Sequence, residues 1–130
     1  MKRLVILGGG TAGTMMSAKL ARALELDEWE ITVVDQDNTH IYQPGLLFIP
    51  FGVYEPRDVK KPRGRFIPPG VKLVISEIEV VDPEKREVRL SDGSALPYDY
   101  LIIATGTRIV PNETEGLMEG GWQKNIFDFY

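Results

Sequence analysis

Cysteine is absent from the 130 residues of this chain, and histidine occurs only once. A chain without cysteine has no disulfide framework, no cysteine-ligated zinc or iron–sulfur site, and no thiol chemistry of its own. This composition fits a reducing compartment. The single histidine, His40, has no carboxylate cluster at ligand spacing near it in the sequence. We therefore expect it to hold its loop by a hydrogen bond rather than to bind a metal.

The chain also lacks a strong excess of charge and any long apolar run. Its net charge is −4 and its pI is about 5.0, whereas nucleic-acid binding usually needs a basic face, so we expect no nucleic-acid partner. The apolar run of residues 4–7 breaks at three glycines, too early for the core of a signal peptide. No run approaches the length of a membrane span. We expect no signal peptide or transmembrane segment, and a cytoplasmic or peripheral membrane location.

The first 35 residues have the pattern of a β–α–β unit. Residues 4–7 form a short apolar run that ends in glycine, as expected for a strand buried on both faces. Residues 11–26 predict a helix, and residues 31–34 a second strand that stops at Asp35. The expected apolar stripe of the helix consists of Ala12, Met16, Leu20 and Leu24. These elements together predict a β–α–β unit over residues 4–35, with a right-handed crossover.

The rest of the chain divides into three parts. Residues 36–70 hold six of the nine prolines and several aromatic residues, which predicts a long functional loop. Residues 71–106 predict a strand at 71–75, a small β-meander with strands at 78–81 and 87–90, and a buried strand at 100–104. The tail, residues 107–130, has little periodicity apart from a possible last strand at 125–130. The predicted class is α/β, with a parallel sheet and a small meander.

Gly8-Gly9-Gly10-Thr11-Ala12-Gly13 satisfies the G-x-G-x-x-G pattern. Gly8 allows the tight turn out of the strand, Gly10 lets the backbone approach a pyrophosphate, and Gly13 allows close packing of helix and sheet. The free N–H groups and the positive dipole end of the helix would stabilise the phosphates. Because a strand precedes the pattern and a helix follows it, the pattern predicts a dinucleotide site.

Asp35 ends the second strand, 22 residues after Gly13. An acid at this position can accept hydrogen bonds from the adenosine ribose, and its charge disfavours a 2′-phosphate. The glycine pattern and Asp35 leave the choice between FAD and NAD open.

Two further segments resemble a known superfamily. Residues 98–106, which end in Ala104-Thr105-Gly106, resemble the A-T-G segment of two-dinucleotide flavoprotein disulfide reductases. Residues 38–47 resemble the loop after the second strand in sulfide:quinone oxidoreductases and their relatives, which include type II NADH dehydrogenases. The resemblance covers residues 4–130 and implies a partial Rossmann-like FAD-binding domain, with FAD rather than NAD as the cofactor.

The resemblance also implies which residues bind the cofactor. Gly8 to Gly13 would hold the pyrophosphate, and Asp35 with Gln36 the ribose. The Ile78 backbone would face the adenine, Thr105 and Gly106 would lie beside the cofactor, and Pro44 would approach the flavin. The implied set is Gly8, Gly9, Gly10, Thr11, Ala12, Gly13, Asp35, Gln36, Pro44, Ile78, Thr105 and Gly106. We expect no metal site and no catalytic residue in these 130 residues.

In the whole protein, the resemblance implies electron transfer from sulfide to FAD and then to a quinone. The family's second glycine fingerprint and redox cysteines are missing here, so we expect an N-terminal fragment that is inactive alone. A type II NADH:quinone dehydrogenase, a non-catalytic dinucleotide-binding module and a one-domain NAD-binding protein remain alternatives.

The middle loop carries two features that bear on partners. Its basic residues are interrupted by acids, so we expect a solvated face, with contact to anionic lipid as the less favoured interpretation. These basic residues are Arg57, Lys60, Lys61, Arg63 and Arg65. Its aromatic residues would either pack beneath the loop or cover the flavin. If they are exposed, they would promote self-association, so the sequence is compatible with a homo-oligomer.

Overall fold

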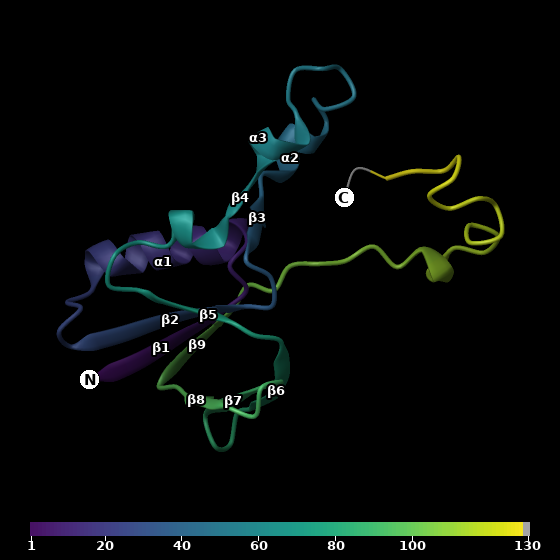
Figure 1. Ribbon diagram of the computed structural model, residues 1–130. Coiled ribbons are helices and arrows are strands. Elements are labelled where there is room, and N and C mark those ends of the chain that lie inside the picture. The colour runs from purple at the N-terminus through teal and green to yellow at the C-terminus, as the bar shows by residue number, and fades with distance from the viewer. Residues whose placement is uncertain (129–130) are drawn as a thin grey trace. The chain divides into compact units, whose positions relative to one another are not determined.

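The computed structural model describes residues 1–128 (Figure 1). The chain forms two compact units. The first unit consists of Met1–Ile41 and Lys61–Gly106, and the second of residues 42–60 together with residues from 107 onward. The glycine loop, Asp35 and the A-T-G segment all lie within the first unit.

A four-stranded parallel sheet forms the centre of the first unit. Its strands are β1 (Lys2–Leu7), β2 (Trp29–Asp35), β5 (Lys72–Ile75) and β9 (Tyr100–Ile103), in the order β5-β2-β1-β9. In register, Leu7 lies opposite both Val34 of β2 and Ile103 of β9. The carboxyl ends of these three strands therefore meet at one edge, where ligands bind in open α/β sheets. The α/β, Rossmann-like class predicted from the sequence is confirmed.

Helix α1 (Thr11–Ala23) covers one face of this sheet (Figure 1). Leu4 and Ile6 of β1, together with Ile31 and Val33 of β2, pack against the helix. The helix contributes Met16 and Leu20 to this contact. The helix ends three residues earlier than predicted, because Leu24 adopts an extended conformation. The prediction that Ala12 belongs to the apolar stripe is wrong, since Ala12 is exposed while Gly13 and Ser17 are buried.

A three-stranded antiparallel meander covers the other face. It consists of β6 (Ile78–Asp82), β7 (Glu87–Leu90) and β8 (Ala95–Pro97). Val88 and Leu90 are completely buried and pack with Val5, Leu7 and Val34. Successive residues of β1 thus point alternately to α1 and to the meander, which explains why this strand is an unbroken apolar run.

Short elements replace regular structure between β2 and β5. β3 (Thr39–Ile41) pairs with β4 (Lys60–Pro62), and a 3-10 turn, η1 (Arg63–Phe66), follows β4. The second unit contains the one-turn helices α2 (Gln43–Leu46) and α3 (Pro56–Val59). Prolines near the start of both helices fit these abrupt beginnings.

Up to residue 128, the tail contains one 3-10 turn, η2 (Pro111–Glu113), and an isolated bridge between Trp122 and Ile126. The predicted strand at 125–130 is wrong for residues 125–128, and residues 129–130 lie outside the described part of the chain. Of the helices within residues 1–128, none combines the length and the apolar character needed to cross a bilayer.

Candidate dinucleotide-binding site

The loop from β1 to α1 begins with a glycine that no other residue could replace without strain. Gly8 has a φ of +95°, and a Cβ at this position would overlap the carbonyl of Ala104. The Gly8 N–H donates to the Val34 carbonyl at 2.7 Å, which ties the loop to β2. The loop therefore turns sharply at the carboxyl end of β1 and comes close to the A-T-G segment.

Gly13 serves packing of the helix. A Cβ on Gly13 would overlap the carbonyl oxygen of Gly8 and would lie 3.5 Å from Cγ2 of Ile6. Only glycine lets the first turn of α1 come this close to β1 and the loop. This geometry agrees with the role predicted for the third glycine of the pattern.

Gly10 differs from both, because nothing lies within 4 Å of where its Cβ would be. Its φ is −71°, which every residue adopts easily, so the fold itself does not require glycine here. Gly10 is the N-cap of α1, and the first turn has neither a side-chain cap nor an acidic residue. An open space beside uncapped N–H groups and a positive dipole end fits an anionic group such as a pyrophosphate.

The carboxylate of Asp35 is held at the end of β2. Its Oδ2 accepts the Gly9 N–H at 2.7 Å, and its Oδ1 accepts the Asp37 N–H at 3.0 Å. Oδ1 also lies 3.2 Å from Nη2 of Arg63, and 15% of the Asp35 side chain is exposed. The predicted ribose acceptor is therefore oriented by fixed partners and still reaches the surface.

A pocket of about 250 Å³ opens at this edge of the sheet. It brings together five residues of the predicted set, and Val34 and Glu77 complete its lining. The five are Gly8, Asp35, Gln36, Ile78 and Thr105. Gly106 follows Thr105 with a φ of +73°. Pro44 belongs to the second unit, so its predicted approach to the flavin stays a prediction.

Arg63 is the residue of this region that sequence analysis misjudged. We expected it on a solvated loop face, but only 6% of it is exposed. Its Nε donates to the Asp37 carbonyl at 2.6 Å and its Nη2 to the Thr39 carbonyl at 2.8 Å. Its Nη1 donates to the Gly9 carbonyl. No local pattern distinguishes Arg63 from the other basic residues of the loop.

His40 behaves as predicted. Its Nδ1 lies 3.4 Å from the carbonyl oxygen of Gly9, and its ring packs on Phe66 with 4.5 Å between ring centroids. Within residues 1–128, no group of three or more histidine, cysteine or acidic side chains is arranged to hold a metal ion. Through its contacts with Gly9 and Phe66, His40 helps to hold the loop.

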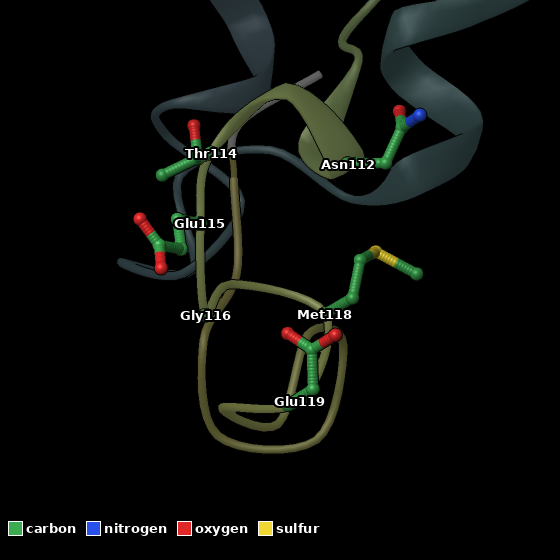
Figure 2. Close-up of a pocket in the computed structure, with 6 residues that line it drawn as sticks. All are labelled: Asn112, Thr114, Glu115, Gly116, Met118 and Glu119. Carbon is green, nitrogen blue, oxygen red and sulfur yellow. The ribbon is translucent and has the colours of Figure 1, made fainter.

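A second cavity, of about 480 Å³, lies in the tail. Its lining includes the carboxylates of Glu115 and Glu119, and Figure 2 shows the Glu115 side chain directed away from that of Met118. Neither a basic group nor a glycine loop lines it. The residues predicted to bind a dinucleotide line the smaller pocket at the sheet edge instead.

The family model for pyridine nucleotide-disulphide oxidoreductases matches residues 2–128. The chain belongs to the pyridine nucleotide-disulphide oxidoreductase family. Members of this family are flavoproteins and oxidoreductases. The resemblance that the glycine loop and the A-T-G segment indicated is thereby confirmed at the level of the family.

The chain is similar to two kinds of protein, sulfide:quinone oxidoreductases and NADH dehydrogenase-like proteins. A mitochondrial sulfide:quinone oxidoreductase of Dictyostelium discoideum is 31% identical over 128 residues, covering 98% of this chain and 28% of that protein. An NADH dehydrogenase-like protein of Mycobacterium tuberculosis is 30% identical over 131 residues, covering 98% of this chain and 32% of that protein. The chain thus spans about a third or less of the length of these relatives.

Comparison with solved structures supports the same family. The X-ray structure of the sulfide:quinone oxidoreductase from Aquifex aeolicus superposes with a TM-score of 0.78 at 25% identity, covering 92% of this chain and 27% of that chain. The similar identities to the two kinds of relative support the family assignment.

Proposed function

We propose that this chain binds the ADP half of FAD and forms the FAD-binding part of a sulfide:quinone-type oxidoreductase. The open space at Gly10, next to the uncapped start of α1, carries the proposal. Gly8 to Gly13 would surround the pyrophosphate, and Asp35 with Gln36 would bind the ribose. Ile78 would face the adenine, Thr105 and Gly106 would border the cofactor, and Pro44 would approach the flavin.

When bound, FAD supplies the two-electron chemistry, in the whole protein between sulfide and a quinone. The residues of this chain bind and orient the cofactor. The N–H groups of the glycine loop would face the negative charge of the pyrophosphate. The carboxylate of Asp35 is held in place by Gly9 and Arg63 before the ligand binds. Preorganised groups of this kind lose little freedom on binding, which favours affinity.

Direct titration tests the cofactor assignment. FAD fluorescence and ADP calorimetry should both report binding to the 130-residue chain. Asp35→Ala should weaken ADP binding by about 1–3 kcal/mol, the scale of a hydrogen bond to a charged group. Because this variant also removes the partner of the Gly9 N–H, circular dichroism must show that it is folded, and Asp27→Ala in an exposed turn is the matched control.

If neither FAD nor ADP binds, the assignment is wrong for this chain. Tight binding of NAD without FAD or ADP would instead support a one-domain NAD-binding protein. A chain that retains no flavin absorbance after excess FAD is removed, but binds ADP, would support a non-catalytic dinucleotide-binding module.

A type II NADH:quinone dehydrogenase is the second candidate for the whole protein, because the relative from M. tuberculosis is about as similar as the sulfide:quinone one. Anaerobic reduction of the flavin in the full-length protein distinguishes them. Bleaching by sulfide and not by NADH supports the first proposal, and the reverse supports the second. Paired cysteines after Tyr130 in the complete gene would also favour sulfide.

Peripheral contact with a membrane is part of the same proposal, since a quinone is a lipid-soluble acceptor. Arg57 and Lys60 of the second unit are exposed and would face anionic headgroups. Co-sedimentation of the full-length protein with vesicles that contain anionic lipid tests this, and a lack of binding at low salt would contradict it. Sedimentation velocity of the same sample tests for a homo-oligomer.

A further inference from the structure

The buried guanidinium of Arg63 connects two separate backbone segments of the first unit, the glycine loop and residues 35–39. Its donors reach the carbonyls of Gly9, Asp37 and Thr39, and Nη2 also pairs with Oδ1 of Asp35 at 3.2 Å. The side chain enters from η1, whose start is fixed by the Arg63 N–H donating to the Asn38 carbonyl at 2.7 Å. A planar fork with five N–H donors suits these diverging acceptors, whereas the compact ammonium of lysine does not.

This arrangement fixes both backbone polar groups of Gly9. Its N–H donates to Oδ2 of Asp35 at 2.7 Å, and its carbonyl accepts from Arg63. A trans peptide unit is planar, and its C=O and N–H point in opposite directions. Since the Gly9 carbonyl is directed to Arg63, the N–H of Gly10 in the same peptide unit is directed away from Arg63.

The same ion pair orients the ribose acceptor. A carboxylate offers about four lone-pair positions in total. In Asp35, Oδ1 is in contact with the Asp37 N–H and Arg63, and Oδ2 accepts one hydrogen bond from Gly9. The side of Oδ2 not used by Gly9 is the position that suits a ribose hydroxyl.

We propose that Arg63 is a positioning residue for the cofactor: it directs the Gly10 N–H toward the pyrophosphate and holds Asp35 for the ribose. It would not contact the ligand itself. This inference rests on the proposed function, because it assumes that the open side of the loop receives the ADP moiety of a dinucleotide. It assigns a role to a side chain that the glycine pattern does not include.

Three variants of the 130-residue chain test it, with ADP as the probe. Arg63→Met removes every guanidinium donor at similar side-chain length, Arg63→Lys keeps the charge, and Arg65→Met is the matched control in the exposed part of the same turn. Arg63→Met should raise the Kd for ADP about tenfold or more, the scale of lost hydrogen bonds to charged groups. Arg63→Lys should fall between it and the wild type, and Arg65→Met should match the wild type.

Amide hydrogen exchange followed by NMR separates positioning from general stability. In Arg63→Met the amides of Gly9 and Gly10 should change chemical shift and exchange faster, while those of Ile6 and Val33 in the sheet keep their protection. In Arg63→Ala, millimolar guanidinium should restore part of the ADP affinity, whereas an equal concentration of sodium chloride should not.

Unchanged ADP affinity in Arg63→Met would overturn the proposal. So would parallel loss of protection in the loop and in the sheet, since that result means that Arg63 only stabilises the fold. If Arg63→Met does not fold, Arg63→Lys provides the test. Wild-type ADP affinity together with an unshifted Gly10 amide in Arg63→Lys would show that the forked guanidinium is not needed. If the wild type binds neither ADP nor FAD, the proposed function fails, and the Gly10 amide still shows whether Arg63 orients the loop.

Discussion

Gly10 and Gly13 lie three residues apart in the same loop, yet a methyl group would meet different surroundings at each. Gly10→Ala should fold with an unchanged melting temperature, because its Cβ enters open space at an ordinary φ. The same methyl group would enter the space that we propose for the pyrophosphate. The Kd for ADP should therefore rise about tenfold or more, the scale of one lost hydrogen bond to a charged group. Thermal unfolding and calorimetry on one sample measure both effects.

Gly13→Ala is the comparison for that experiment. Its Cβ would overlap the Gly8 carbonyl, and overpacking of a tight contact costs about 1–3 kcal/mol or more. We expect a lower free energy of unfolding by urea, accompanied by loss of ADP binding. Equal stability of the two alanine variants would contradict the division of roles between these glycines.

Asp99 gives the fold a dependence on pH. Its carboxylate accepts hydrogen bonds from the Arg3 side chain at 3.1 and 3.2 Å and from the Arg3 N–H at 2.7 Å. These hydrogen bonds lower the pKa of Asp99 from 3.8 to about 2. Because the folded pKa lies below the unfolded one, the pair stabilises the fold above pH 4, and this contribution is lost as the pH falls from about 4 toward 2.

Asp99→Asn should therefore flatten the fall in stability between about pH 4 and pH 2. Urea unfolding at a series of pH values measures this, with Asp27→Asn in an exposed turn as the control. An Asp99→Asn variant whose stability falls with pH as steeply as that of the wild type would contradict the assignment. Arg3 and Asp99 join the start of β1 to the start of β9, at the end of the sheet away from the site.

At the scale of elements, the meander is a structural part of the core. Leu90 of β7 has no exposed surface and packs with Val5 and Leu7 of β1. Leu90→Ala should lower the free energy of unfolding by about 2–5 kcal/mol, the range for large-to-small changes in a core. Val80→Ala, where 39% of the residue is exposed, should cost under about 1 kcal/mol. Similar losses in the two variants would contradict a shared core of sheet and meander.

The elements that sequence analysis predicted correctly are those with strong local patterns. Strands β1 and β2 were recognisable because they are buried on both faces and read as continuous apolar runs. β8 was missed because its three residues, Ala95–Pro97, have no pattern of their own and pair with β7 by tertiary contact. The end of α1 was misplaced because apolar spacing continues through Leu24, which packs on the core without being helical.

At the scale of the whole molecule, the two units differ in how many of their residues are buried. Among the described residues of the second unit, only Gly45 and Val59 are buried, whereas 81% of Phe51 is exposed. Segments with few buried contacts open at low free-energy cost. Chymotrypsin should therefore cut first within residues 48–54, and Phe51→Ser should slow that cut. First cuts within β1 or β2 would contradict this difference in local stability.

The amino-acid sequence alone determined the β–α–β unit, the glycine loop and the acid at the end of β2. Each of these depends on residues within one short stretch, where strand burial, the steric freedom of glycine and helix geometry act locally. Only the tertiary structure decided that Arg63 is buried beside Gly9, 54 positions earlier in the chain. Burial of a charged side chain depends on acceptors supplied by distant segments, and no local pattern records where a connecting loop will bring them.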